Sequence, residues 1–224
     1  MPNCDDMSEK ADAWERVHSN YAEIWDNEPD PDRLRQAYAI AEAEPENAFQ
    51  MYRNLADSGS ITSMITVAWY YPWGNGKVVP PDDDQAYYWY KRAWAAGSWL
   101  ATRDYARFVA NRGNFAECED VLKMGVEKDW TPAFYWLAHY RLKQSNSLKA
   151  HREVKPLLET AAERGHPWAQ LLLARSMMRG KFGVREIPRG MKLMREQVAN
   201  CVAELNARDK SDHAVLAETE TKAA

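Results

Sequence analysis

The chain has 224 residues, a formal net charge of −4 and a hydrophobic content of 46%. That apolar content excludes disorder of the whole chain, and the length suits one elongated domain with a sizeable core. The acidic balance argues against a nucleic-acid partner, because general nucleic-acid binders ordinarily carry a basic excess.

The beginning of the sequence carries no targeting signal. It reads Met1-Pro2-Asn3-Cys4, with no cationic segment leading into an apolar run. No stretch approaches the length needed to span a bilayer, so we expect a cytoplasmic protein. The three cysteines, Cys4, Cys118 and Cys201, lie far apart and are odd in number. We therefore expect neither a disulfide framework nor a paired-cysteine zinc site.

The first elements in chain order are two helices. Residues 8–27 carry apolar side chains at helical intervals, which predicts one amphipathic leading helix: Ala11, Trp14, Val17, Tyr21, Ile24 and Trp25. Pro31 and Asp32 then mark the first turn of a helix that runs towards Ala43. We expect residues 1–44 to form N-terminal helices that cap the open end of an array.

The array is predicted by a repeat. Four times a small or loop-forming residue, which we call an anchor, is followed nine positions later by alanine: Gly59 and Ala68, Gly97 and Ala106, Asp129 and Ala138, Gly165 and Ala174. The fourth position after each anchor is small, and the eighth is apolar: Ser63, Ala101, Ala133 and Ala169, then Val67, Tyr105, Leu137 and Leu173. Such steps trace one face of a helix.

A second helix precedes each anchor. Before Gly59, for example, Ala48, Tyr52 and Leu55 share one helical face. Each unit is therefore a helical hairpin whose second helix ends at the next anchor. A glycine anchor supplies the left-handed residue that ends a helix, so we expect the turn at Asp129 to differ.

After Gly165 we expect a helix over residues 167–179, a loop over 180–183 and a final helix from about Pro188. The chain turns polar from Asn206. These boundaries predict a repeat array over residues 45–202 and a mobile polar tail over residues 203–224.

The segment 74–97 resembles a Sel1-like repeat, a relative of the tetratricopeptide repeat. It carries Gly74-Asn75-Gly76-Lys77-Val78, acidic residues, the pair Trp89-Tyr90 and a closing Gly97. Residues 157–169 are similar to the junction between two such repeats, and 179–184 to their loop. The unit from Gly97 to Asp129 departs most, because its loop, residues 111–114, is shorter.

The resemblance implies an all-α fold, a right-handed α-solenoid of about four to five hairpins with an N-terminal capping helix. It also implies a bacterial adaptor or scaffold for signalling, secretion or envelope assembly, working by protein-protein interaction. In tetratricopeptide-like arrays the first helix of each hairpin lines the concave groove, so that helix is where a partner would bind.

One face of the first helices does not take part in the predicted core. It holds positions six, ten and fourteen after each anchor, which we call the outer stripe: Ile65, Trp69, Trp73, Arg103, Arg107, Asn111, Tyr135, His139, Lys143, Leu171, Arg175 and Arg179. The stripe is basic, with aromatic residues at one end. Its cations could pair with carboxylates, while its tryptophans are side chains enriched in binding hot spots.

We therefore expect a groove for an acidic, partly apolar peptide or helix of a partner protein. The expected binding residues are Trp69, Trp73, Arg103, Arg107, Tyr135, His139, Lys143, Arg175 and Arg179. Two alternatives stay open: the arginines form only a solvated face, or the tryptophans are buried against the leading helices.

Catalytic motifs are not apparent, so we expect no enzyme, no cofactor and no metal. None of the five histidines stands at a zinc-protease spacing, and Gly74-Asn75-Gly76-Lys77 lacks the pattern of a phosphate-binding loop. An adaptor is the favoured function. The alternatives are an inhibitor or immunity protein that tightly binds a secreted toxin, and an enzyme that depends on His139. The oligomeric state stays open.

Overall fold

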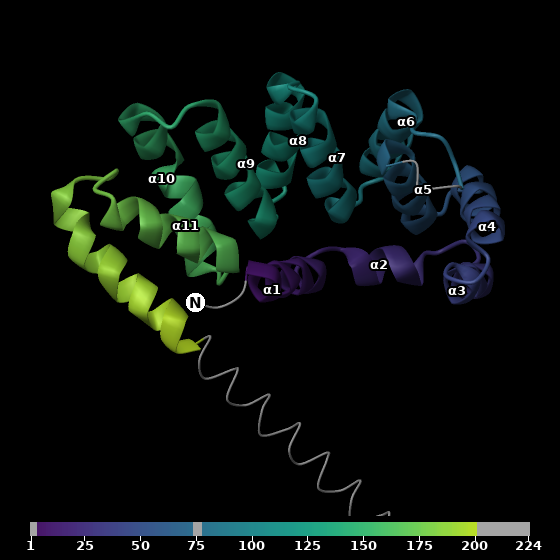
Figure 1. The fold of residues 1–224 in the computed structure, drawn as a ribbon, viewed down its shortest axis with the longest axis horizontal. Coiled ribbons are helices and arrows are strands. Elements are labelled where there is room, and N and C mark those ends of the chain that lie inside the picture. The colour runs from purple at the N-terminus through teal and green to yellow at the C-terminus, as the bar shows by residue number, and fades with distance from the viewer. Residues whose placement is uncertain (1–3, 74–77, 201–224) are drawn as a thin grey trace, which may run out of the picture. The chain divides into compact units, whose positions relative to one another are not determined.

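The computed structural model describes residues 4–73 and 78–200, with side chains for residues 10–72 and 78–200. Within these ranges the regular secondary structure is entirely helical (Figure 1), so the all-α prediction is confirmed. The predicted tail, residues 203–224, lies outside the described residues, and the predicted division at residues 44 and 202 stays a prediction.

The N-terminal part holds α1 (Cys4–Val17), α2 (Tyr21–Asp26), α3 (Pro31–Ile40) and α4 (Pro45–Asp57). The expectation of one helix over residues 8–27 is wrong, because the chain turns at residues 18–20. Side chains there bond carbonyls of the last turn of α1, as they often do where a helix ends. His18 Nδ1 donates to the Trp14 carbonyl at 2.8 Å, and Ser19 Oγ donates to the Arg16 carbonyl at 2.7 Å.

The repeat helices follow at the predicted places. They are α5 (Ile61–Trp73), α6 (Asp83–Ala95), α7 (Trp99–Asn111), α8 (Phe115–Glu127), α9 (Thr131–Gln144), α10 (Leu148–Glu163) and α11 (Pro167–Met178). The short 3-10 helix η1 (Val184–Glu186) then leads into a helix over residues 187–200.

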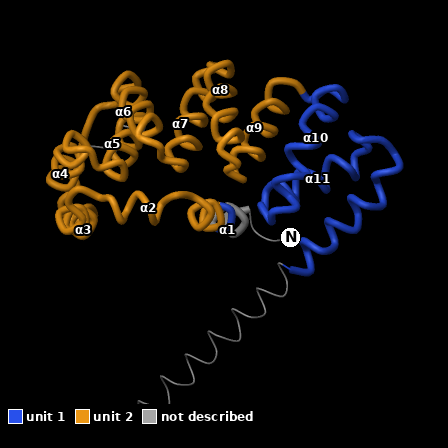
Figure 2. Tube along the Cα trace, turned by 180° about the vertical axis from the view of Figure 1, so that it is seen from behind, with its two compact units in different colours: residues 1–11, 146–224 blue, residues 12–145 orange. Residues whose placement is uncertain are grey.

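The chain divides into two compact units (Figure 2). In the unit of residues 12–145, the helices from α3 to α9 each pack against the next helix in the chain, and α7 also contacts α9. In the unit of residues 1–11 and 146–224, α10 packs against α11. Consecutive packing of this kind is typical of an α-solenoid.

The alanine column provides the close packing that the repeat predicted. Ala68, Ala106, Ala138 and Ala174 are all 0% exposed. One close approach in the unit of residues 12–145 is at Gly125 on α8, where an added Cβ would lie 2.7 Å from the Ala133 Cβ on α9. Small residues at these positions let neighbouring helices meet almost backbone to backbone.

The anchors end their helices in the left-handed conformation, as predicted. The φ angles are 104° at Gly59, 93° at Gly97 and 88° at Gly165, but Asp129 also has a positive φ of 57°. The expectation that the Asp129 turn differs is wrong. Trp130 N–H donates to the Gly125 carbonyl at 3.0 Å, as His166 N–H does to the Ala161 carbonyl at 2.9 Å. Aspartate is one of the few other residues that enter this region.

Two findings concern the membrane and the cysteines. Among the described residues, no helix combines the length and the apolar character required to cross a bilayer. Cys118 is a buried free thiol, and burial, with a smaller contribution from Glu119, raises its pKa to about 12. Cys4 and Cys201 have no described side chains.

Candidate partner-binding surface

The outer stripe leaves three large side chains accessible in the unit of residues 12–145. Trp69 on α5 is 48% exposed and packs edge-to-face on Tyr70, with ring centroids 6.0 Å apart. The side chain of Arg107 on α7 is 48% exposed. Lys143 near the end of α9 is exposed, and its ammonium lies 5.9 Å from the centroid of the Tyr140 ring.

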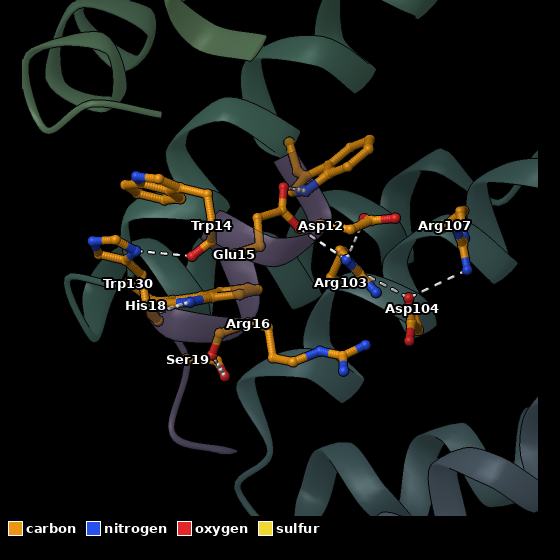
Figure 3. Close-up of polar contacts among 11 residues, drawn as sticks. Asp12, Trp14, Glu15, Arg16, His18, Ser19, Arg103, Asp104, Arg107 and Trp130 are labelled. Atoms are coloured by element: carbon orange, nitrogen blue, oxygen red, sulfur yellow. Dashed lines mark hydrogen bonds and ion pairs between the residues drawn. The ribbon is translucent and has the colours of Figure 1, made fainter. Parts of the chain in front are cut away.

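Arg103, one turn before Arg107, is the centre of a charge network (Figure 3). Its guanidinium lies 2.9 Å from a carboxylate oxygen of Asp12 and 3.0 Å from one of Glu15, both on α1. Asp104 is a third partner at 3.0 Å and also pairs with Arg107 at 3.3 Å. The charge of Arg103 is thus satisfied by carboxylates of the chain itself.

Burial and the neighbouring carboxylates have opposite effects on the pKa of Arg103. The Arg103 side chain is 16% exposed, and burial alone would lower its pKa, because a charge is costly to remove from water. The carboxylates of Asp104 and Glu15 outweigh burial and raise the pKa of Arg103 above its ordinary value. The guanidinium is therefore a permanent cation, and three carboxylates surround it.

Glu15 links α1 to two first helices at once. Its side chain is 1% exposed. One carboxylate oxygen accepts from Arg103 on α7, and the other accepts from Trp136 Nε1 on α9 at 2.9 Å. Both oxygens of the buried carboxylate are therefore satisfied, which is what burial of such a group requires.

Two further contacts bind the N-terminal residues to the first helices. The His18 carbonyl accepts from Trp130 Nε1 at 3.1 Å. The Asn20 amide donates to the Gly97 carbonyl at 2.9 Å and accepts from Trp99 N–H at 3.0 Å. We call residues 12–28 the docked segment. It runs along one side of α5, α7 and α9 (Figure 1).

Aromatic residues of α9 pack against one another next to this network. Tyr135 is buried, and its ring centroid lies 5.8 Å from that of His139. Trp136 packs on His139 at 5.5 Å and stacks on Tyr140 at 5.9 Å. Burial, and to a lesser degree the charge of Lys143, lowers the pKa of His139. The neutral imidazole is therefore favoured at this position.

Two cavities lie between the docked segment and the repeat helices. The larger, of about 360 Å³, is lined by residues that include Tyr21, Ile24, Tyr38, Thr62 and Ile65. The smaller, of about 290 Å³, is lined by Asn20, Glu28 and the anchors Gly59 and Gly97, among others. The docked segment thus covers only part of the stripe and leaves open space beside it.

The structure therefore divides the stripe into covered and open residues. Arg103 and Tyr135 are covered, and Ile65 is half-buried at the larger cavity. Trp69, Arg107, Asn111 and Lys143 are open, and His139 is half-buried. The side chain of Trp73 lies outside the described residues. In the other unit, Arg175 and Arg179 are exposed at the end of α11, and Leu171 is half-buried. The assignment of these residues to partner binding stays a prediction.

Sequence reasoning did not find Glu15, Asp104, Trp136 or Asn20. A signal for Glu15 was present, because it stands four positions after Ala11 on the apolar face of the leading helix. Asp104 and Trp136 both stand seven positions after their anchors, between the core face and the outer stripe. Asn20 carried no signal, because its partners are backbone groups of a distant turn.

Among the side chains described, no group of three or more histidine, cysteine, aspartate or glutamate residues is placed to hold a metal ion. The network around Arg103 instead joins α1 to α7 and α9 through charge-assisted hydrogen bonds and an indole N–H.

Neither a protein-family model nor a curated protein matches the sequence. Solved structures do match in fold. A Sel1 repeat protein from Oxalobacter formigenes superimposes with a TM-score of 0.62 at 18% identity, covering 77% of this chain and 73% of that one. The protective antigen c5321 of uropathogenic Escherichia coli, described as displaying an SLR fold, gives 0.57 at 19% identity. That match covers 70% of this chain and 35% of c5321.

Proposed function

Starting from a chain with the Sel1-like repeat fold, we propose that this protein is a non-enzymatic interaction module. It binds an acidic, partly apolar segment of a partner protein along the first helices of its hairpins. In the unit of residues 12–145, Trp69, Arg107, His139 and Lys143 make direct contact. Arg175 and Arg179 offer a second basic surface on the other unit. The location we propose is the cytoplasm.

The observation that supports this proposal is the contact between α1 and the first helices. Arg103 on α7 and Trp136 on α9 together hold a buried carboxylate of a helix that does not belong to a hairpin. The same face thus accommodates an acidic helix. Next to it, the exposed guanidinium of Arg107 extends the positive charge, and Trp69 offers an apolar anchor.

Charge reversal at the open cations tests the proposal. We expect Arg107→Glu combined with Lys143→Glu to abolish capture of the partner by the purified chain from its own cell lysate, while helicity is unchanged. Repulsion between the new carboxylates and an acidic segment provides the physical reason. The matched control for either single charge reversal is Lys128→Glu, which makes the same charge change as one of them at the exposed end of α8.

The second basic surface is tested separately. We expect Arg175→Glu to weaken capture, with Arg152→Glu on α10 as its control, because both arginines are exposed in the same unit. Capture that survives both charge reversals would contradict the proposed surface. The stoichiometry separates the alternatives: an inhibitor forms a tight one-to-one complex with one toxin, whereas an adaptor binds segments of several proteins more weakly.

A further inference from the structure

The docked segment has the chemistry that the proposed surface requires of a partner. Five of its residues are acidic and one is an arginine: Asp12, Glu15, Glu23, Asp26 and Glu28, with Arg16. Trp14, Tyr21, Ile24 and Trp25 add apolar surface. We propose that residues 12–28 are a displaceable intramolecular ligand that occupies the surface of α5, α7 and α9 until a partner helix of the same chemistry replaces it. This inference rests on the proposed function.

Polar contacts connect the segment to the repeat helices at several points. Glu15, which is almost fully buried, pairs with Arg103 and accepts from Trp136. Asn20 and the His18 carbonyl add hydrogen bonds to the Gly97 turn and to Trp130. Any helix that offers a carboxylate at the place of Glu15 can make the same central contact, because Arg103 and Trp136 belong to the repeat helices.

Packing against the segment is incomplete. The cavities of about 360 Å³ and 290 Å³ both have residues of the segment on one side and repeat residues on the other. Neither buried carboxylate oxygen of Glu28 has a hydrogen-bond partner among the described residues, and Thr62 Oγ1 on α5 has none either. Unpaired buried oxygens reduce the free energy gained by docking.

The repeat helices differ in this respect. Between α8 and α9 the space at Gly125 is too small for a single added methyl group, since a Cβ would lie 2.7 Å from the Ala133 Cβ. Tight packing of this kind resists opening, whereas local opening is concentrated where packing is poor. The segment can therefore leave while the hairpins stay folded.

The contacts of Glu15 define the carboxylate that a partner helix must provide. A competing helix must place one carboxylate between Arg103 on α7 and Trp136 on α9, with a second acidic residue three positions earlier, as Asp12 stands to Glu15. It must also bring apolar side chains to the larger cavity, which Tyr21, Ile24 and Ile65 line. The predicted partner is thus an amphipathic acidic helix.

Hydrogen exchange of the full-length chain tests release of the segment. Glu15→Lys places a second cation beside Arg103, so we expect amides of residues 12–26 to exchange about tenfold faster or more, with α7 and α9 unchanged. Glu15→Gln, which keeps the shape of the side chain, should give a smaller change in the same direction. Asp26→Lys is the matched control, because it makes the same charge change at an exposed position of the segment.

A synthetic fluorescent peptide of residues 12–28 then tests replacement in trans. We expect it to bind the Glu15→Lys chain about tenfold more tightly than the wild-type chain, where the resident segment competes. A peptide that itself carries Glu15→Lys should bind neither chain. Equal binding of the wild-type peptide to both chains, binding to neither, or equal acceleration of exchange in α7 and α9 would overturn the inference.

The two proposals fail independently. The peptide and exchange measurements use only this chain, so they hold or fail whether or not lysate capture depends on Arg107 and Lys143. If capture does depend on these cations, Glu15→Lys should increase it by opening the same surface.

Discussion

The carboxylate of Glu15 on α1 lies 3.0 Å from the guanidinium of Arg103 on α7, although the two residues are 88 positions apart in the chain. The Glu15 side chain is 1% exposed, so this is a buried ion pair with its remaining oxygen satisfied by Trp136. It connects an N-terminal helix to the hairpins and covers Arg103 of the outer stripe.

A double-mutant cycle measures this pair. Arg103→Ala should lower the free energy of unfolding by about 3 kcal/mol, because it leaves buried carboxylates without a counter-charge. Glu15→Gln should cost about 1 kcal/mol, since the amide can still accept from Trp136. We expect a coupling of about 2 kcal/mol in urea denaturation followed by circular dichroism. Additive single effects would show that the pair contributes nothing of its own.

Gly125→Ala tests the close approach of α8 to α9. Alanine would ordinarily stabilise a helix interior by about 1 kcal/mol over glycine. Here its Cβ would lie 2.7 Å from that of Ala133, so we expect a loss of about 2 kcal/mol in urea denaturation instead. The second-site change Ala133→Gly should recover part of this loss by making room. A stabilised single variant would contradict the packing described.

The backbone at Asp129 can be tested by comparing two truncations. Asp129→Ala and Asp129→Gly remove the same side-chain interactions, so their difference reports the left-handed φ of 57°. We expect the glycine variant to be more stable by about 1 kcal/mol, because only glycine adopts this conformation without a steric cost. Equal thermal and urea stability of the two variants would argue against a left-handed residue there.

The stability of the unit of residues 12–145 should depend on pH through His139. Burial, followed by the charge of Lys143, lowers its pKa below the unfolded value of 6.5. The unfolded chain therefore binds more protons between the two pKa values, so stability is complete above pH 6.5 and falls as the pH decreases below it. The hydrogen bond to Arg141 lowers the pKa of Glu119. The stability that Glu119 contributes is therefore lost only below about pH 4.5, outside the range of His139.

Urea midpoints at about pH 7.5 and about pH 5.5 check this expectation. His139→Gln should reduce the difference between the two midpoints, because it removes the titrating group. His151 provides a reference in the other unit, since burial also lowers its pKa and the same direction of change is expected. An unchanged pH dependence in His139→Gln would assign the effect to other groups.

Local chemistry made most of the fold predictable. The helical period of the small and apolar residues placed each repeat helix, and the glycine anchors placed the turns, because helix formation and helix ends depend on near neighbours. Two details were misjudged for equally local reasons. Asp129 adopts the conformation expected of glycine, and α1 ends before His18 and Ser19, whose side chains bond carbonyls of its last turn, where periodicity alone continued the helix.

By itself, then, the sequence determined the hairpins, their buried alanine column and which residues form the outer stripe. Only the tertiary structure decided which of those residues are covered, because α1 and α2 lie outside the repeat and no periodicity states where they dock. Arg103 reads as an open cation in the sequence. In the fold it is paired with its neighbour Asp104 and with Asp12 and Glu15, which are distant in the chain, since a charge that is largely buried must be paired.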